Sequence, residues 1–283
     1  SLDISKNPTR LFIVKSNNGQ QLGYLFPTTT YTNGQTANLN LAGTYSNFTS
    51  EIVNFSAETY YGVTVFGRPS ATDFTEKYLV SQALDYGNQL TIQYPGNTFP
   101  AYASESFIAG DNFSFTAYNK ASRSDFSLFN ASTEVEVNNR TVSYDVTSEG
   151  KVVVFDVDME GASQSEEMQW EIYAPAGLNQ SFVIPQLPEE IANLFDSYNE
   201  NNWVFDGELG VIVAEDVNTV TDYFVEETEG RLYNSKNIKY LNLYLDASAA
   251  RGNVKARSEQ KQKRFNLFNT KARLERNFLK EIK

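Results

Sequence analysis

The sequence predicts a mainly β protein built from two β-sandwich domains, with one short helix and a C-terminal amphipathic helix. Three observations predict this class. Turn signals recur about every 8–15 residues over most of the chain, a spacing typical of sandwiches rather than of alternating strands and helices. Aromatic residues make up 14% of the chain, with 20 Phe and 17 Tyr, and such residues favour strands. Several segments also alternate apolar and polar residues with a period of two.

The first expected domain covers residues 1–100. Its opening strand is the apolar run at residues 11–15, and the Asn-Asn-Gly sequence at 17–19 is a strong hairpin signal. The other strands of this domain are expected at residues 21–26, 36–41, 60–66 and 89–94. Pro95 and Pro100 then break the pattern, and we place the domain boundary near them.

The second expected domain covers residues 101–250. Residues 151–157 form a nearly continuous apolar run, which is typical of a central strand. Residues 168–174 are its expected hairpin partner, and the acidic residues 216–230 fit neither a strand nor a helix clearly. The other strands are expected at residues 113–118, 125–129, 134–137, 141–146, 181–184, 209–214 and 240–245.

One short helix is expected at residues 188–198. Pro188 suits the first turn of a helix, and the two glutamates after it favour the positive end of the helix dipole. Ile191, Leu194 and Phe195 have the i, i+3, i+4 spacing of one apolar helix face. This is the first segment along the chain that predicts a helix.

Residues 251–283, which we call the basic segment, differ in charge from the rest of the chain. They carry eleven Lys or Arg against three Asp or Glu, a net charge of +8, whereas the whole chain has a net charge of -12. Residues 1–250 therefore have a net charge of -20. Opposite charge in two parts of one chain usually indicates two environments or two partners.

The basic segment predicts an amphipathic helix, because it is rich in helix formers and contains no Pro. Its apolar half is expected to include Phe265, Leu267, Phe268, Ala272, Leu274, Phe278, Leu279 and Ile282. Its basic half is expected to carry Arg273, Arg276 and Lys280. The helix is expected to dock either on its own domain or in a groove of a protein partner, and our functional interpretation uses the partner. An anionic membrane surface and nucleic acid are further alternatives.

The composition restricts the chemistry, because the chain contains no histidine and no cysteine. Histidine-based catalytic triads, thiolate nucleophiles, His or Cys metal ligands and disulfides are therefore excluded. We expect a protein that is not an enzyme. The acidic main body argues against nucleic acid as its partner, and no run of 18 apolar residues predicts a membrane-spanning helix.

One loop resembles the EF-hand calcium motif, and calcium is the one cofactor that the sequence suggests. The matching residues are Asp156, Asp158 and Glu160 at positions 1, 3 and 5, Gly161 at position 6 and Glu167 at position 12. Position 5 is usually Asp or Asn, position 8 is Ser163 instead of an aliphatic residue, and both flanks predict strands. The alternative interpretation is a polar hairpin loop.

Three further surface chemistries are weighed. Six Asn-x-Ser/Thr sequons begin at Asn47, Asn54, Asn112, Asn130, Asn139 and Asn179, and they carry glycans only in a secretory or similar setting. Candidates for a glycosidase-type carboxylate pair are Glu171, Asp206, Glu208 and Asp216. Their spacing along the sequence does not predict that any two of them lie close together. Possible members of a sugar-stacking platform are Tyr31, Tyr60, Tyr61 and Trp203, although most aromatic residues are expected in the core.

Two stretches carry a family resemblance. The chain opens with Ser-Leu-Asp-Ile-Ser-Lys-Asn-Pro, and residues 170–177 (WEIYAPAG) precede SFVIPQLPEE at 181–190. These stretches are similar to outer-membrane surface lipoproteins of Bacteroidota. The resemblance implies immunoglobulin-like sandwich domains, an extracytoplasmic location at the outer membrane or cell surface, and anchoring through a lipid on a cysteine preceding Ser1. This cysteine is not in the chain, and a basic C-terminal helix departs from the pattern of the group.

These features predict a non-enzymatic surface or periplasmic lipoprotein that serves as an accessory or structural subunit of an outer-membrane protein assembly. In this interpretation the acidic β body faces solvent and the basic segment docks to a neighbouring protein. A virion or filament structural subunit is the first alternative, because the absence of Cys and a terminal docking arm suit self-assembly. A carbohydrate-binding protein is the second alternative.

Overall fold

The structure is a computed structural model that describes residues 2–3, 10–18, 20–38, 44–73, 76–110, 112–159, 168–196 and 198–245. Within these residues the chain is mainly β, as the sequence predicts, and neighbouring strands pair antiparallel. The basic segment lies outside the described residues. The C-terminal helix therefore stays a prediction.

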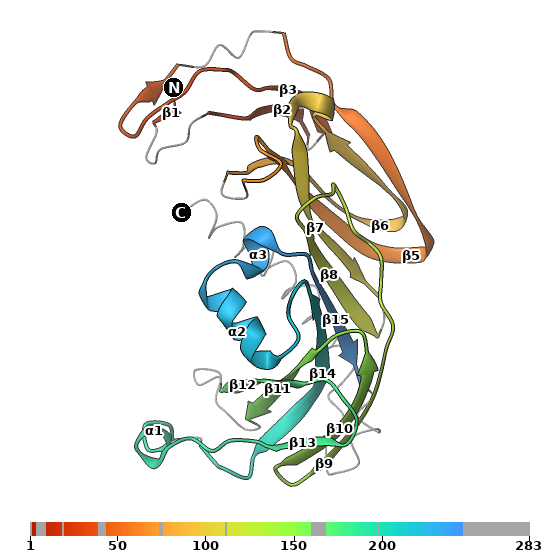
Figure 1. Ribbon diagram of the computed structural model, residues 1–283, viewed down its shortest axis with the longest axis vertical. Helices are drawn as coiled ribbons and strands as arrows, with labels where there is room; N and C mark the ends of the chain where they lie inside the picture. The colour runs from red at the N-terminus through yellow and green to blue at the C-terminus, as the bar shows by residue number, and fades with distance from the viewer. Residues whose placement is uncertain are drawn as a thin grey trace.

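Eight strands form the main sheet, in the order β12-β11-β14-β15-β8-β7-β5-β6. Their bounds are β5 Thr49–Arg68, β6 Tyr78–Tyr94, β7 Ala101–Ala109, β8 Phe113–Asn119, β11 Val152–Met159, β12 Gln169–Pro175, β14 Trp203–Ala214 and β15 Ile238–Tyr244. The sheet is strongly curved, and two helices lie on its inner side (Figure 1). We call the side that carries these helices the inner face and the opposite side the outer face.

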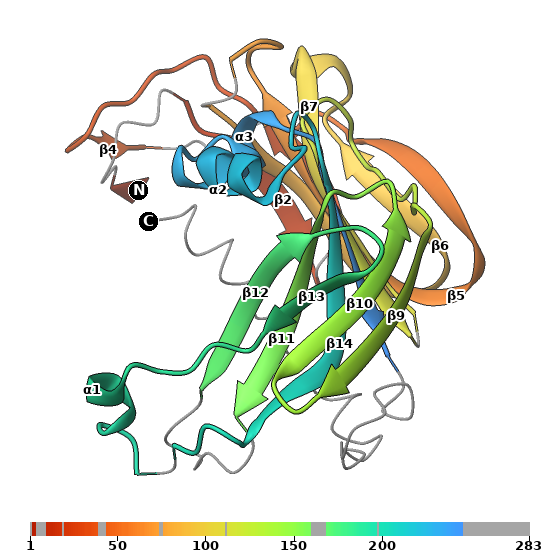
Figure 2. The same cartoon turned by 60° about the horizontal axis from the view of Figure 1, so that its bottom comes forward.

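A smaller sheet covers part of the outer face. It consists of β9 (Ala131–Asn138), β10 (Thr141–Ser148) and β13 (Gln180–Val183), in the order β13-β10-β9. In Figure 2, β9 and β10 lie in front of β14. Strand alternation turns Val135 and Val137 into a core that they share with Phe155 of the main sheet, while the residues between them point to solvent.

Helices cover part of the inner face. They are α2 (Val220–Thr228) and α3 (Leu232–Ser235), and their buried Tyr223 and Leu232 pack on Ile212 and Tyr240. Alternation along β11 explains how one strand serves both faces, because Val153, Phe155 and Val157 belong to the outer core and Val152 to the inner one. The main sheet is thus covered on both faces around β11, β14 and β15.

The expected helix at 188–198 is shorter than the sequence predicts. Helix α1 covers only Glu189–Ala192, and turns follow it. Ile191 is exposed and Leu194 is 73% exposed, so the expected apolar face has nothing to bury it. Phe195 instead packs against the outer core from the following turns. Helices in proteins are stabilised mainly by packing of one apolar face. Because the expected apolar face is not buried here, the helix ends after a single turn.

The N-terminal part packs mainly through aromatic side chains. A hairpin of β2 (Ile13–Asn17) and β3 (Gln20–Leu25), the short pair β1 (Leu2–Asp3) and β4 (Thr36–Ala37), and the 3-10 turn η1 (Gly96–Thr98) accompany β5 and β6. The core there contains Tyr61, Val63, Ile92 and Phe99, with Phe26 packed against it. Gly67 allows the Phe99 ring to lie directly on β5, since a Cβ at Gly67 would stand 2.4 Å from the ring.

Strand pairing continues across the expected boundary near residue 100, whereas the side-chain cores change there. Strand pairing crosses it, because β5 pairs with β7 and β7 with β8. The side-chain cores change near the same place, since Tyr102 belongs to the N-terminal core and Ile108 to the outer core. The division into two domains stays a prediction.

Candidate functional site

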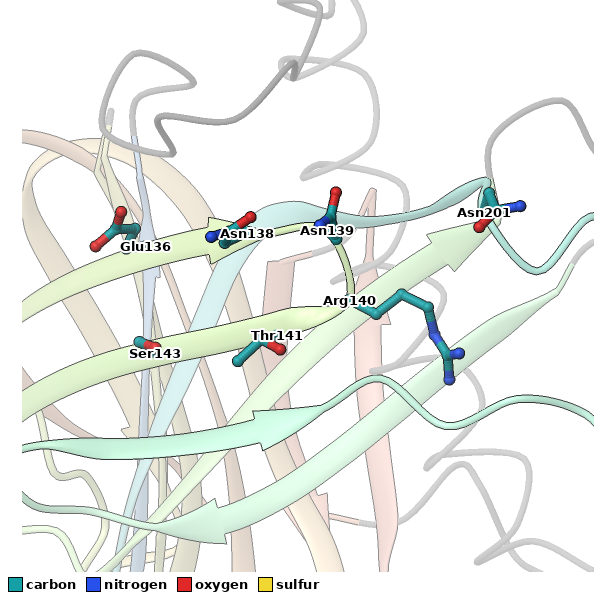
Figure 3. A pocket seen from close by; sticks show the side chains of 7 residues that line it. All are labelled: Glu136, Asn138, Asn139, Arg140, Thr141, Ser143 and Asn201. Carbon is teal, nitrogen blue, oxygen red and sulfur yellow. The ribbon is translucent and has the colours of Figure 1, made fainter.

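An open depression lies at the β9–β10 hairpin (Figure 3). It has a volume of about 570 Å³ and is lined by Glu136, Asn138, Asn139, Arg140, Thr141, Ser143 and Asn201. The turn depends on Asn139, whose φ of 54° lies in the left-handed region that Asn tolerates better than most residues. The Arg140 guanidinium is fixed, because its Nε donates to the Ile184 carbonyl at 3.1 Å. All seven lining residues are polar, so the depression offers hydrogen bonds and no stacking surface.

A row of carboxylates crosses the inner face, and we call it the acidic row: Asp156 of β11, Glu171 of β12, Glu208 of β14 and Glu227 of α2. Asp156 and Glu171 are direct cross-strand partners and therefore share a face. Gly210 pairs across both neighbouring strands on this face, and Glu208 lies two residues before it. The side chains of Glu171 and Glu227 are exposed, and those of Asp156 and Glu208 are half-buried.

Aromatic side chains accompany the acidic row. The Tyr173 ring stacks on Tyr223 of α2 with centroids 5.3 Å apart, and its hydroxyl donates to Glu171 Oε2 at 3.3 Å. Partial desolvation of its carboxyl group raises the pKa of Glu227 although much of the side chain is exposed, and the nearby charge of Glu171 raises the pKa further. Burial also raises the pKa of Tyr173, with the charges of Glu171 and Glu227 adding to it. These pKa shifts have the direction expected where negative charge accumulates.

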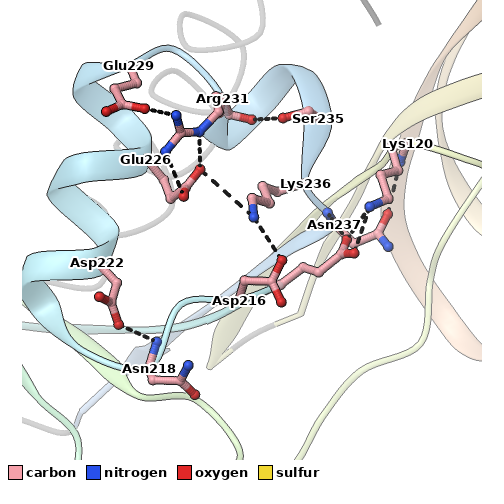
Figure 4. Close-up of polar contacts among 11 residues, drawn as sticks. Lys120, Asp216, Asn218, Asp222, Glu226, Glu229, Arg231, Ser235, Lys236 and Asn237 are labelled. Atoms are coloured by element: carbon pink, nitrogen blue, oxygen red, sulfur yellow. Dashed lines mark hydrogen bonds and ion pairs between the residues drawn. The ribbon is translucent and has the colours of Figure 1, made fainter. Parts of the chain in front are cut away.

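A second polar cluster fastens the helices to the sheet (Figure 4). Lys236 Nζ lies 2.9 Å from Asp216, and Arg231 Nε lies 2.9 Å from Glu226. Lys120, which follows β8, approaches Glu215 after β14 with its Nζ 2.6 Å from Oε2. The hydrogen bond from Lys120 lowers the pKa of Glu215. The Arg231 and Lys236 contacts join α2, α3 and the turn before α2, whereas the Lys120–Glu215 pair joins the ends of β8 and β14. We assign the cluster a structural role.

The predicted calcium ligands are only partly described. Asp156 and Asp158 lie in strand β11, so the first four positions of the motif, residues 156–159, are extended. Glu160 and Glu167 lie outside the described residues. Among the described residues, no group of three acidic side chains is placed to hold a metal ion. Calcium binding stays a prediction.

The predicted docking residues are Phe265, Phe268, Leu274, Phe278, Leu279, Arg273, Arg276 and Lys280, and all lie outside the described residues. Of the carboxylates considered from the sequence, Glu171 and Glu208 lie on the same face of the main sheet. Asp156 lies on β11, the strand between theirs. Asp216 belongs to the ion cluster, and the side chain of Asp206 is not described. Sequence reasoning missed this grouping because only strand register reveals it.

The suggested aromatic platform is not assembled as the sequence suggested. Tyr61 and Trp203 are buried, while Tyr60 is 45% exposed. The partner of Tyr60 is Tyr86, which the sequence did not single out, with ring centroids 4.7 Å apart. The six sequon asparagines Asn47, Asn54, Asn112, Asn130, Asn139 and Asn179 are all exposed.

Comparisons with known proteins leave this chain without an assigned family. No protein-family model matches it, and no curated protein and no solved structure is significantly similar to it. In the part of the chain that the structure describes, no helix has the length and apolar character needed to cross a membrane. Function must therefore be argued from the surfaces of the molecule itself.

Proposed function

We propose that the protein is a non-enzymatic structural or accessory subunit of a larger protein assembly outside the cytoplasm, and that the edge strand β6 is a contact surface for its partner. A scaffold of this kind acts through shape and through exposed strand edges. The proposal includes location at an outer membrane or cell surface and anchoring through a lipid.

The open edge of β6 is the observation that carries this proposal. The strand is 17 residues long, and Asp85 is its one charged residue. Among the described strands, β5 pairs with one edge of β6 and none pairs with the other. Leu84 is 57% and Tyr86 is 51% exposed on this strand. Natural proteins usually protect such edges with charge, proline or a covering element, so a long, apolar open edge indicates a binding surface.

Replacing Leu84 by Lys tests the proposal. A lysine on an edge strand opposes pairing, and the exposed position should leave folding intact. The matched control is Thr147→Lys, an exposed strand position on the smaller sheet. Both variants are purified from native membranes or envelopes beside the unchanged protein, and co-purifying partners are quantified. We expect L84K to lose its partner and T147K to keep it. Equal recovery with both variants, at equal thermal stability, would refute the proposal.

The finer assignment to immunoglobulin-like sandwiches and to surface lipoproteins belongs to the same proposal. The shared core of β9, β10 and the main sheet supports a sandwich arrangement. The similarity of residues 1–8, 170–177 and 181–190 supports the lipoprotein assignment. Intact-mass analysis of native protein tests it, because a diacyl or triacyl cysteine before Ser1 adds a defined mass. An unmodified native N-terminus at Ser1 would contradict it and would favour a virion or filament subunit.

Carbohydrate binding is a second candidate, favoured by the Tyr60–Tyr86 pair. Two half-exposed aromatic rings in contact form an apolar surface with polar hydroxyls, which suits the face of a sugar ring. A glycan array with the unchanged protein and Tyr86→Ala tests this candidate. Binding that disappears in the variant supports it, and no binding to any glycan removes it.

A further inference from the structure

We propose that the acidic row on the inner face is the docking site of the protein's own basic segment, residues 251–283. The sequence leaves open whether this segment docks on its own chain or on a partner. The geometry around the end of β15 favours the chain itself. This inference is independent of the proposed β6 interface.

The first argument is the position of the last described residues. Tyr244 ends β15 and is the cross-strand partner of Glu208, a member of the acidic row. The next residue, Leu245, donates its backbone N–H to the Gly207 carbonyl at 2.8 Å. The last described residue before the basic segment therefore lies beside Glu208, at one end of the acidic row.

The second argument is reach. The acidic row crosses β14, β11 and β12, and two strand spacings amount to about 10 Å. The ten residues between Leu245 and residue 256 can span about 33 Å when extended. A short tether of this kind gives an effective concentration in the millimolar range. A separate partner must bind much more strongly, or be very abundant, to compete.

The third argument is the match in chemistry. The basic segment has a net charge of +8, and the four carboxylates of the acidic row belong to a body with a net charge of -20. The same surface also has an apolar part, since Phe224 is 41% exposed with its ring 5.0 Å from that of Tyr173. A segment that combines Phe and Leu with Arg and Lys can satisfy both parts. Charge attraction would guide it, and apolar contact would hold it.

A pair of introduced cysteines tests the proposal in the full-length chain. Because the native sequence has no cysteine, the two introduced thiols are the only thiols in each chain. Thr228→Cys is exposed and directly follows Glu227, and Asn277→Cys lies among the basic residues, so no charge is altered. The matched control combines Asn277→Cys with Ser143→Cys, an exposed position of the smaller sheet. A short bismaleimide is added at low protein concentration, and intact mass measures cross-linked monomer.

We expect the Thr228–Asn277 pair to cross-link within one molecule at least about tenfold faster than the control pair, because docking raises the local concentration. In 1 M NaCl the two rates should become similar, since the Debye length falls to about 3 Å. Equal rates at low salt would overturn the proposal. Cross-links that form only between molecules would also overturn it, because they would make a second copy the acceptor.

A charge exchange provides a second test. Glu171→Lys combined with Glu227→Lys should remove the rate advantage of the Thr228–Asn277 pair. Adding Arg273→Glu and Arg276→Glu to the same chain should restore it. Both glutamates are exposed, so circular dichroism should show an unchanged fold. Failure of the restoration in a folded protein would contradict ionic docking at this site. None of these outcomes alters the L84K experiment, so the two proposals can fail separately.

Discussion

The two ends of the main sheet differ in how many of their faces are covered. Around β11, β14 and β15 both faces are covered, by the smaller sheet on one side and by α2 and α3 on the other. Around β5 and β6 the described core lies on one face, while Tyr60 and Leu84 remain exposed. The difference suggests a division of labour. The doubly covered end provides stability, and the singly covered end leaves surface for contact.

Phe155→Ala should have the largest effect on this comparison. Phe155 is fully buried between the two sheets, so its truncation should lower the free energy of unfolding by about 3–5 kcal/mol. Leu84→Ala at the open edge is the control and should change it by no more than about 0.5 kcal/mol. Urea denaturation followed by tryptophan fluorescence measures both, because Trp170 and Trp203 belong to or pack against the outer core. Similar losses in the two variants would contradict the division of labour.

Phe99→Ala examines whether the two ends unfold together. Phe99 lies in the N-terminal core, and its removal should cost about 3 kcal/mol, at the lower end for Phe because partly buried aromatic neighbours can relax. Since β7 pairs with both β5 and β8, we expect one cooperative transition. Both tryptophans lie outside this core. Because the transition is expected to be cooperative, the midpoint of their fluorescence change should nevertheless move to a lower urea concentration. An unchanged tryptophan transition would show that the two ends unfold independently.

Gly67→Ala should have an intermediate effect. A Cβ at this position would stand 2.4 Å from Phe99 Cδ2, and such overpacking costs about 1–3 kcal/mol. Gly62→Ala is the control on the same strand. Its Cβ would stand 3.1 Å from Leu84 Cδ1, the end of an exposed side chain that can move. Thermal unfolding should rank the two variants in this order, and the reverse order would contradict the role of Gly67.

Local sequence patterns predicted those strands whose own apolar residues indicate which side chains are buried. The apolar run at 151–157 became β11, and the alternation at 113–118 became β8. The expected strand at 125–129 is wrong, because these residues belong to no strand, and the Asp125 carboxylate instead accepts the Ser127 N–H at 2.9 Å. Strand β7 was missed, since its small residues Ala and Ser give no strong strand signal.

The candidate site was less accessible to sequence reasoning than the fold. Asp156 and Glu171 become neighbours through the β11–β12 register, and Glu208 joins them through β14. The helix α2 lies in the acidic stretch whose structure the sequence left open. Helix α2 begins at a capping box formed by Thr219 and Asp222. This local signal is hard to recognise in a stretch with so many acidic residues.

Thr219→Ala should weaken the helical cover of the inner face. The Thr219 hydroxyl accepts the Asp222 N–H at 3.1 Å, and loss of such a cap costs about 1 kcal/mol. Thr221→Ala, an exposed position in the same helix, is the control and should not destabilise the protein. Hydrogen exchange should show faster exchange of α2 amides in T219A alone. Unchanged exchange would mean that packing of Tyr223 holds the helix without its cap.

The smallest predicted effect concerns the ion pair that joins the residues following β8 and β14. The Lys120 ammonium lowers the pKa of Glu215, so the ionised carboxylate is favoured in the folded state. The resulting stability is present above the unfolded pKa of about 4.3 and is lost as pH falls through the folded value. Glu215→Gln should therefore lower the free energy of unfolding by about 0.5 kcal/mol at pH 7, a value reduced by solvent screening, and should have little effect near pH 3. Exposed Glu134→Gln on the smaller sheet is the control. Urea titrations at both pH values measure the difference, and a loss that persists unchanged at pH 3 would show that the pair acts through packing and not through charge.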